Sequence, residues 1–352
     1  MNEQMSLAKS FSMGDFALPA VGFGTFQGDE GNSGVRDAVL AALKIGYRHI
    51  DTAAAYGNEK EVGEAIKESG IPRDQIFVTT KLAQTWHSPL DVEEAIDRSL
   101  RDLQLDYVDL YLMHFPHAYA AGPNHSTMRH PNNKPIIDYE LSREYTKTWM
   151  AMEELVVNRK VRFIGERFPE SPVAFASIVS DLCCCQGLSN FNIIKTKRVL
   201  EVAKIRPFVN QVELHPYLPQ HQLLLFCKQE NIHLMGHQPL GGRPVAAVNP
   251  NMDRPGPLLD SEIATVASTH AKSPAQVLLS WAVQRGTSVV PKTVHEDRMK
   301  ENRELFILSD EEMALVDGLA ESKGMVRYLD PKNHIGFDIF REDIDEPVEG
   351  TD

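Results

Sequence analysis

The feature that most constrains the fold is a regular alternation of strand-like and helix-like segments along the chain. The strand-like segments are short runs of apolar and β-branched residues, and most are followed by a stretch in which apolar residues recur every three or four positions. The strand-like segments lie at residues 20–25, 47–53, 76–82, 107–114, 161–165, 208–214, 232–240 and 288–293. Eight strand–helix units in one chain predict an α/β fold, a closed (β/α)8 barrel that forms a single domain over residues 1–352.

The alternative to such a TIM barrel is a doubly wound open sheet. Its nucleotide-binding form carries the glycine pattern G-x-G-x-x-G directly after the first strand. Here Gly22, Gly24 and Gly28 have one residue too many before the last glycine, so the spacing disfavours the open sheet. In the barrel, functional side chains would converge where the carboxyl ends of the strands meet.

The composition argues against several classes of partner. The 352 residues carry a net charge of −13, with 24% charged and 42% hydrophobic. Nucleic acids and anionic membranes require clustered lysine and arginine, so we expect neither as a partner. No signal peptide and no apolar run of about 18 residues is visible. Four cysteines, three of them adjacent at 183–185, fit neither a disulfide framework nor zinc-ligand spacing, so we expect a cytoplasmic protein without a metal site.

Four polar side chains stand at or just beyond the ends of the second, third and fourth strand segments. They are Asp51 and Tyr56 after the second, Lys81 at the end of the third and His114 at the end of the fourth. Taken alone, each is more often a solvated charge or a half-buried packing residue. A barrel would bring all four to one mouth, where they can act together.

Together the four groups suit proton donation to a carbonyl oxygen. A free tyrosine has a pKa of about 10 and is a poor acid near neutral pH. We expect the ammonium of Lys81 to lower the pKa of Tyr56, and the carboxylate of Asp51 to hold that ammonium charged and in place. A neutral His114 can orient the carbonyl while a hydride reaches its carbon, so the site requires a cofactor that carries hydride.

Later strand ends carry groups that suit a nicotinamide nucleotide. Ser189 and Asn190 follow the fifth strand segment, and Gln211 lies within the sixth. Hydroxyl and amide side chains of this kind can bind the carboxamide of a nicotinamide ring.

The segment after the last strand, residues 292–302, offers groups for the other end of such a nucleotide. Lys292, Thr293 and Arg298 place two cations and a hydroxyl within seven residues, which suits a phosphate monoester. The residues that could pair with an adenine edge are Glu301 and Asn302. The alternative is an exposed helix start, capped by Thr293 or Asp297.

From "LPAVGFGT" to "VVPKTVHEDRMKENREL", the chain resembles the aldo-keto reductase family in the type and order of these motifs. The resemblance implies a barrel that reduces aldehydes or ketones with NADPH, an NADP-dependent oxidoreductase acting on CH–OH groups. It implies a catalytic tetrad of Asp51, Tyr56, Lys81 and His114, with Tyr56 as the general acid. The residues that it places at the cofactor are Thr25, Phe26, Asp51, Ser189, Asn190, Gln211, His237, Leu240, Lys292, Thr293, Arg298, Glu301 and Asn302.

Two positions depart from the pattern of the family. Where the family commonly stacks a tyrosine on the nicotinamide, in a motif like "AYSPLG", this chain has "GHQPLG" and therefore His237. A smaller ring offers less stacking area, so we expect weaker cofactor binding. The tryptophan often found shortly after the tetrad lysine is replaced by Ala83, with Trp86 nearby. We expect Trp86 and His114 to contact the substrate.

The C-terminal tail, residues 324–352, lies where family members drape a loop over the barrel mouth. It contains two phenylalanines, Phe337 and Phe340. They could close the substrate pocket or only pin the tail to the barrel.

One segment, residues 166–187, does not fit the pattern. Joining Gly165 to Leu188 gives "VRFIGLSNFN", an uninterrupted fifth strand and cofactor turn, so the 22 residues between them are interpreted as an insertion. Because its length keeps the reading frame and codon degeneracy allows splice signals at both ends, we interpret it as a retained intron. A tolerated surface loop is the alternative. Either way, the insertion precedes Ser189 and Asn190 and could displace them.

These observations predict an enzyme that reduces the carbonyl of small aldehydes, ketones or open-chain sugars to alcohols with NADPH, leaving NADH open as a second cofactor. The alternative is a non-catalytic or impaired cofactor-binding barrel, because the insertion would disrupt the nicotinamide site. We expect a small-molecule carbonyl substrate and a monomer or weak homodimer.

Overall fold

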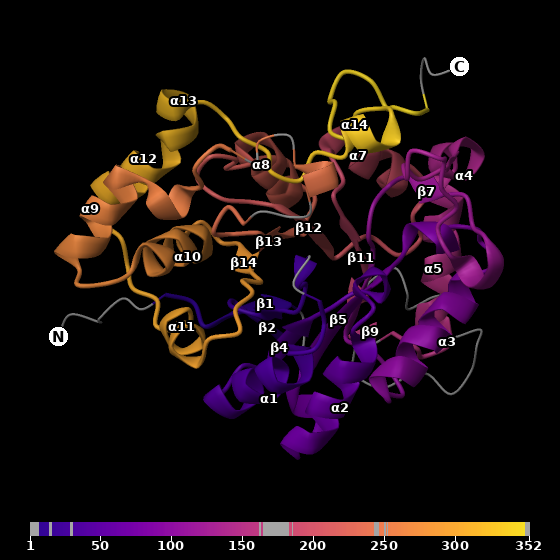
Figure 1. Cartoon of the computed structure of the whole chain (residues 1–352), viewed down its shortest axis with the longest axis horizontal. Coiled ribbons are helices and arrows are strands. Elements are labelled where there is room, and N and C mark those ends of the chain that lie inside the picture. Colours follow the sequence, from indigo (N-terminus) through magenta and orange to yellow (C-terminus); the bar gives the residue numbers. More distant parts are fainter. Residues whose placement is uncertain are drawn as a thin grey trace.

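The computed structural model describes residues 7–13, 16–28, 31–161, 163–164, 183–184, 186–242, 246–249, 251 and 253–348. Its centre is a parallel sheet of eight strands in the order β3–β4–β5–β6–β11–β12–β13–β14 (Figure 1). These are β3 (Phe23–Gly24), β4 (His49–Asp51), β5 (Phe77–Leu82), β6 (Leu110–Met113), β11 (Gln186–Ser189), β12 (Val209–Glu213), β13 (His233–His237) and β14 (Ser288–Val289). Val21 pairs with Val289, and the N–H of Gly22 donates to the carbonyl of Val289 at 2.8 Å, so the sheet closes into the predicted barrel.

Helices surround the barrel (Figure 1). The longer ones are α1 (Val35–Ile45), α2 (Glu59–Ser69), α3 (Val92–Leu103), α5 (Tyr145–Val157), α7 (Ile193–Val202), α8 (His221–Gln229), α9 (Ser261–Thr269), α10 (Pro274–Gln284) and α12 (Asp310–Asp317). The shorter ones are α4 (Tyr139–Arg143), α11 (Glu296–Glu301), α13 (Leu319–Lys323) and α14 (Lys332–Ile335). Their ends follow local rules: α1 stops at Gly46, whose φ is 107°, and α10 starts with a capping box at Ser273 before Pro274.

Apolar helix faces pack onto the strands and form the core. Along α3, the spacing of Val92, Ile96 and Leu100 puts the three side chains on one face, and all three are buried. Strand residues such as Ile50 and Val209 are buried as well, because side chains fill the barrel interior and helices cover its outside. Burying one such side chain contributes roughly 1.5–3 kcal/mol, so the barrel is a firm support for the groups at its strand ends.

The fifth barrel strand differs from the prediction. It is β11, which pairs in parallel with both β6 and β12. β9 (Phe163–Ile164), from the segment predicted to form this strand, pairs antiparallel with β10 (Cys183–Cys184) in a separate two-stranded sheet. Among the described residues of this segment, Val161 keeps a parallel bridge, to Val108. The first two residues of β11, expected within the insertion, therefore belong to the barrel, while residues 165–182 and 185 lie outside the described residues.

The second residue of β11 has to be a glycine. A Cβ on Gly187 would lie 2.5 Å from the carbonyl oxygen of Val209 and 2.7 Å from Cδ2 of Leu112. The preceding residue, Gln186, is fully buried. Its Nε2 donates to the carbonyl of Met152, but its Oε1 has no partner among the described residues. The first position of β11 therefore suits an apolar side chain better than a glutamine, and the second requires glycine.

By sequence count alone, residues 164–165 would fit the register of the first two residues of β11 if a strand continued from Val161. Counting along the parallel ladder from the bridge between Val161 and Val108 puts residue 164 opposite Tyr111 and residue 165 opposite Leu112. The first two residues of β11 have these same partners. Both segments also end in glycine, so they offer one register and differ in an isoleucine against a glutamine.

Besides the pair of β9 and β10, two small antiparallel pairs lie outside the barrel. β1 (Ser10–Met13) pairs with β2 (Phe16–Pro19) just before the first barrel strand, and Phe11 packs against both large hydrophobic clusters. β7 (Ala118–Tyr119) pairs with β8 (Ile137–Asp138) in the long connection after β6.

The C-terminal tail packs beside the residues that follow β6. Phe337 and Ile339 are buried in a cluster with Phe115, and the guanidinium of Arg327 lies 3.7 Å from the centroid of the Phe340 ring. Figure 1 shows the tail, in yellow, next to α7. The two phenylalanines thus hold the tail in place, while a role in closing the pocket stays a prediction.

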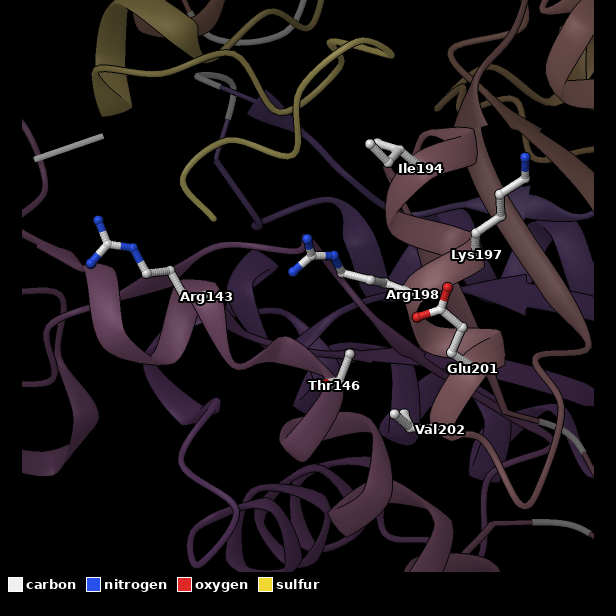
Figure 2. Close-up of a pocket in the computed structure, with 7 residues that line it drawn as sticks. All are labelled: Arg143, Thr146, Ile194, Lys197, Arg198, Glu201 and Val202. Carbon is white, nitrogen blue, oxygen red and sulfur yellow. The ribbon is translucent and has the colours of Figure 1, made fainter. Parts of the chain in front are cut away.

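An open cavity of about 470 Å³ lies between α5 and α7 (Figure 2). Its lining consists of Arg143, Thr146, Ile194, Lys197, Arg198, Glu201 and Val202. None of these is a predicted catalytic residue. Within the described ranges, no helix is both long and apolar enough to cross a membrane.

Candidate active site

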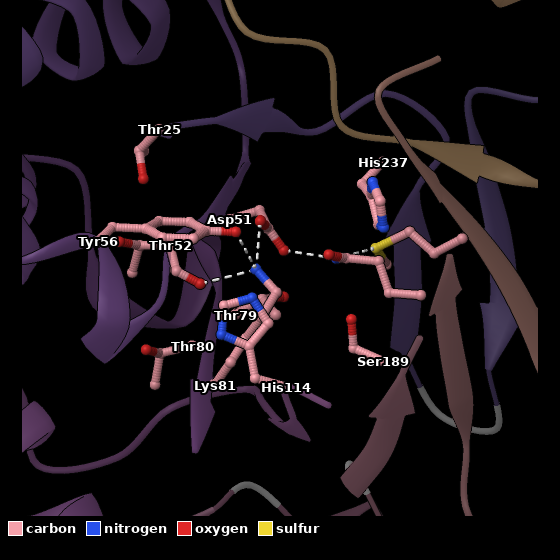
Figure 3. Close-up of polar contacts among 12 residues, drawn as sticks. Thr25, Asp51, Thr52, Tyr56, Thr79, Thr80, Lys81, His114, Ser189 and His237 are labelled. Carbon is pink, nitrogen blue, oxygen red and sulfur yellow. Dashed lines mark hydrogen bonds and ion pairs between the residues drawn. The ribbon is translucent and has the colours of Figure 1, made fainter. Parts of the chain in front are cut away.

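The four predicted catalytic side chains meet at the carboxyl ends of β4, β5 and β6 (Figure 3). Asp51 ends β4, Lys81 is the last but one residue of β5, and His114 directly follows β6. Tyr56 ends a short 3-10 turn, Ala54–Tyr56, after β4. Parallel strands all end on one side of the sheet, which is why residues far apart in sequence share this site.

Lys81 lies at the centre of the cluster. Its Nζ is 2.6 Å from Oδ1 of Asp51, 2.9 Å from the carbonyl of Thr52 and 3.3 Å from the hydroxyl of Tyr56. The three contacts match the three donors of an ammonium, and the side chain is only 1% exposed. Burial lowers the pKa of Lys81, but Asp51 and Tyr56 raise it more, so the group is charged at neutral pH.

The pKa of Tyr56 is raised, where the sequence led us to expect a lowered one. Burial is the largest effect and raises the pKa, while Lys81 lowers it as predicted without cancelling the effect of burial. The phenol is therefore protonated at neutral pH, the state that a proton donor requires. The ammonium is placed to stabilise the phenolate once the proton has left.

His114 completes the cluster as a neutral ring. Burial, and then the charge of Lys81, hold its pKa well below the ordinary value. The ring meets that of Tyr56 edge to face, with centroids 5.6 Å apart. Its Nδ1 is buried and has no hydrogen-bond partner in the described part of the chain. A neutral imidazole here can orient a carbonyl oxygen without replacing Tyr56 as the acid.

Ser189, the last residue of β11, and Asn190, which follows it, lie beside the tetrad; we call these two residues the nicotinamide turn. Asn190 has a φ of 63°, its N–H donates to the carbonyl of Gln211 at 2.9 Å, and its Nδ2 donates to the carbonyl of His114 at 2.9 Å. The Nε2 of Gln211 donates to Oδ2 of Asp51 at 2.6 Å. All three residues predicted for the carboxamide therefore adjoin the tetrad, and the turn is tied to the strands on both sides of it.

His237, at the end of β13, makes a contact that the sequence did not predict. Its Nε2 lies 2.9 Å from Oδ1 of Asn190. Burial lowers the pKa of His237 to about 4, so the ring is neutral and donates its Nε2 proton in this hydrogen bond. Leu240 lies three residues further on and is half-buried against the core.

The end of β3 contributes a polar atom without a partner. Oγ1 of Thr25 is buried, has no hydrogen-bond partner among the described residues and points toward the tetrad (Figure 3). A Cβ on Gly24 would meet the carbonyl of Val290 at 2.7 Å, so the backbone passes close there. Phe26 is partly exposed, and its ring centroid lies 4.9 Å from that of Tyr56.

The residues predicted for the phosphate and adenine lie around α11. Oγ1 of Thr293 accepts the N–H of His295 at 3.2 Å, and His295 precedes α11 without a side-chain cap. Neither Thr293 nor Asp297 therefore serves as the N-cap of this helix. Of the remaining residues, Lys292 is half-buried, Arg298 and Glu301 are exposed, and Asn302 is buried.

Trp86 does not join the tetrad. Its ring stacks on His125, with centroids 3.4 Å apart and an interplanar angle of 12°. The guanidinium of Arg98 lies 4.7 Å from its ring centroid. The residue is 8% exposed, about as much as His114 at 7%, and its contact with the substrate stays a prediction.

Sequence reasoning missed a residue that supports the site. Asn58 is fully buried, donates to the carbonyl of Thr25 at 3.0 Å and accepts the hydroxyl of Thr52 at 2.8 Å, which ties the first two strand ends together. An asparagine before a helix normally indicates a cap, so its sequence carried no sign of this role. The residues that the structure describes contain no group of three or more His, Cys, Asp or Glu able to hold a metal ion.

A half-buried tyrosine beside a buried lysine, a buried aspartate and a neutral histidine, at the carboxyl end of a parallel barrel, defines the site of a carbonyl-reducing oxidoreductase. A profile described as "Aldo/keto reductase family" matches residues 20–170 and 182–321. The chain is 40% identical to aldo-keto reductase family 1 member A1 of Bos taurus over 322 residues, 89% of each chain. It is 39% identical to an uncharacterized oxidoreductase of Schizosaccharomyces pombe over 312 residues, 88% of this chain and 85% of that one.

A solved structure shows the same architecture. The aldose reductase of Schistosoma japonicum superposes with a TM-score of 0.76 at 29% identity, covering 98% of this chain and all of that one. This chain belongs to the aldo/keto reductase family, and it is an oxidoreductase that reduces carbonyl groups with a nicotinamide nucleotide. The family profile skips residues 171–181, which lie inside the predicted insertion.

Proposed function

We propose that this chain reduces the carbonyl of small aldehydes, ketones or open-chain sugars, with NADPH as the preferred hydride donor and Tyr56 as the general acid. The observation that carries the proposal is the position of Lys81, whose buried ammonium contacts both the Tyr56 hydroxyl and the Asp51 carboxylate. This arrangement favours transfer of the phenolic proton to an oxygen on which negative charge develops.

When bound, the nicotinamide nucleotide supplies the hydride. The residues of the chain donate the proton and stabilise the charge that its transfer leaves behind. His114 orients the carbonyl oxygen, and Tyr56 gives it the hydroxyl proton. Lys81, 3.3 Å from the Tyr56 oxygen, stabilises the phenolate that remains, and Asp51 holds the ammonium in place through an ion pair of 2.6 Å. The protein thus supplies charge stabilisation that is already organised before the reaction begins.

The residues present fit NADP(H). The buried hydroxyl of Thr25 has no partner among the described residues, so it is ready to hydrogen-bond a ligand. Ser189 and Asn190, beside the tetrad, suit the carboxamide. The adenosine end is assigned to Lys292, Thr293, Arg298, Glu301 and Asn302. Two cations in this group favour the 2′-phosphate of NADPH over the hydroxyl of NADH.

The test of the catalytic role is Tyr56→Phe, which removes only the hydroxyl. We expect kcat with a panel of aldehydes to fall by at least about 100-fold, while NADPH still binds. Tyr139→Phe, at a partly exposed tyrosine, is the matched control and should leave kcat unchanged. Full activity in Tyr56→Phe would overturn the proposal.

The test of the cofactor preference is Arg298→Ala. This variant should weaken the binding of NADPH more than that of NADH, and an equal loss of both affinities would contradict the preference.

We further propose that residues 166–187 are an insertion, originating as a retained intron, in the fifth strand and nicotinamide turn. Support comes from the gap in the family match at 171–181 and from the pairing of β9 with β10 instead of with the barrel. Sequencing the transcript across this region tests the origin. The unpartnered Oε1 of Gln186 favours the alternative function, an impaired cofactor-binding barrel. If the full chain bound NADPH as tightly as a variant that lacks residues 166–187, that alternative would be contradicted.

We also propose a cytoplasmic protein that acts as a monomer or weak homodimer on a small-molecule carbonyl. Support comes from Cys227, which is buried and unpaired as in a reducing compartment. Sedimentation at several concentrations tests the oligomeric state, and a tight dimer at nanomolar concentration would contradict it.

A further inference from the structure

The C-terminal tail contacts the first turn of α7, the helix that follows the nicotinamide turn within the same loop. The carboxylate of Glu342 accepts two backbone N–H groups, that of Ile193 at 3.0 Å and that of Ile194 at 3.2 Å. These amides have no partner within the helix itself, and a negative charge is favourable at a helix N-terminus. The tail therefore fixes the start of α7 from outside the helix.

A second tail residue, Asp345, fixes α7 one turn further along. Its carboxylate is fully buried and lies 2.5 Å from Nζ of Lys195 and 3.0 Å from Nε of Arg198, both on α7. The hydroxyl of Tyr145, on α5, donates to the same carboxylate at 2.8 Å. Asp345 thus joins α7 to the neighbouring helix through charges removed from water.

The tail is also tied to the far side of the cavity between these helices. Arg143, on α4, donates from Nε to the carbonyl of Pro347 at 2.9 Å. Figure 2 shows Arg143 and Arg198 on opposite sides of this cavity. The tail therefore spans from α4 to α7. A shift of α7 relative to α5 would strain the contacts of Asp345 with Lys195 and Tyr145.

On its other side, the nicotinamide turn follows β11, which pairs in parallel with both β6 and β12. The chain enters β11 directly from β10, which pairs with β9 and not with the barrel. The strand that leads into the turn therefore follows a segment that adds nothing to the barrel ladder. After the turn, Asn192 caps α7 and donates from its side chain to the carbonyl of Arg341 in the tail.

We propose that Glu342 and Asp345 are positioning residues for the cofactor: by anchoring α7 they hold Ser189 and Asn190 where the nicotinamide carboxamide binds. The inference rests on the proposed function, because it assigns the carboxamide to this turn. Without the Asp345 charge, Lys195 is left in a buried place without its counter-charge, and α7 relaxes toward solvent. The nicotinamide end of the cofactor site loosens with it, while the adenosine end, at α11, does not.

The test uses the full chain and two probes, NADPH and adenosine 2′-monophosphate, which occupies only the adenosine end. Asp345→Asn removes the buried charge, and Glu342→Ala removes the acceptors of the two helix-start amides at an exposed site that does not endanger folding. The control is Asp343→Asn, at an exposed tail carboxylate paired only with Arg341 among the described residues. Dissociation constants come from fluorescence titration, and circular dichroism confirms that each variant is folded.

We expect the Kd for NADPH to rise about tenfold in Asp345→Asn and about threefold in Glu342→Ala, with the Kd for adenosine 2′-monophosphate unchanged in both. The control should bind both probes like the wild type. Equal weakening of both probes, or no weakening of NADPH in either variant, would overturn the positioning role and leave the proposed function standing. A wild-type chain that binds neither probe would overturn the proposed function and this inference with it.

Discussion

The tetrad and the nicotinamide turn are neighbours in space, yet the chain holds them in different ways. The tetrad comes from three adjacent strands, and its central ion pair, between Lys81 and Asp51, lies within the barrel itself. The turn comes from a strand a few residues after the stretch that the family profile skips, and its helix is held by the C-terminal tail about 150 residues away. On the proposed roles, the proton donor is held by the barrel alone, whereas the turn proposed for the nicotinamide is held both by barrel strands and by contacts outside the barrel.

This difference implies that the two functions can be damaged separately. A change within the tetrad should lower the rate of chemistry and spare cofactor binding. A change at β11, at His237 or in the tail should weaken cofactor binding and spare the rate of chemistry. Measurements that separate NADPH affinity from kcat can therefore test whether the two regions act independently.

The largest effect is expected for Lys81→Met. The variant keeps the length of the side chain but removes the charge that stabilises the phenolate, so kcat should fall by about 1,000-fold. The Kd for NADPH should change less than about threefold, because the turn is held elsewhere. Single-turnover kinetics and fluorescence titration measure the two quantities. Lys67→Met, at an exposed lysine on α2, is the control. A loss of NADPH affinity as large as the loss of kcat would show that the two regions are not separable.

A second prediction concerns acid sensitivity on the tetrad side. His87 and His117 are buried, their ring nitrogens have no partners among the described residues, and burial lowers the pKa of each to about 3. The unfolded chain takes up these protons near pH 6.5 and the folded chain does not. The free energy of unfolding should therefore fall as the pH drops below about 6.5, by up to about 1.4 kcal/mol per pH unit for each histidine. Above that pH these two groups contribute no dependence.

Urea unfolding at pH 7.5 and pH 5 measures this effect. His117→Phe removes one of the buried rings that must stay neutral and keeps an aromatic side chain in the cluster with Phe337. Its unfolding free energy should depend less steeply on pH than that of the wild type. An identical pH dependence would contradict the assignment.

The contrast also marks how far sequence reasoning reaches. The tetrad could be predicted because strand ends are visible in the hydrophobic pattern and parallel strands share one edge. The fifth strand could not be resolved, because residues 164–165 and Gln186–Gly187 fit the same register and both supply the glycine. The tail contacts to α7 join segments about 150 residues apart and have no local signature. The raised pKa of Tyr56 depends on burial, which motif spacing does not reveal.

The choice between the two fifth strands can be tested with two deletions of equal length. Removing 166–187 gives "VRFIGLSN", and removing 164–185 gives "VRFQGLSN", so each deletes 22 residues and keeps the glycine. Both variants should bind NADPH more tightly than the full chain, because the strand then runs directly into the turn. The variant with isoleucine should be more stable by about 1–3 kcal/mol, since the other buries a glutamine carbonyl without a partner.

Urea denaturation and NADPH titration of the two deletion variants and the full chain provide the comparison. Equal stability of the two would show that Gln186 finds a partner for its Oε1 once the segment is gone. Equal or tighter NADPH binding by the full chain would show that the insertion does not weaken the cofactor site.

The smallest effect is expected at His237, where a ring that departs from the family pattern donates a hydrogen bond to Asn190. His237→Phe keeps an aromatic face for the nicotinamide but removes the donor, so Oδ1 of Asn190 is left without it. The loss of one such hydrogen bond costs about 1 kcal/mol, which corresponds to an NADPH Kd roughly fivefold higher. The kcat at saturating NADPH should stay within about twofold, because the proton path through Tyr56 is untouched. His233→Phe, on the same strand but bonded to Ser288, is the matched control. If His237→Phe bound NADPH more tightly, stacking area would outweigh the hydrogen bond, and the turn would be held by the tail and Gln211 without help from His237.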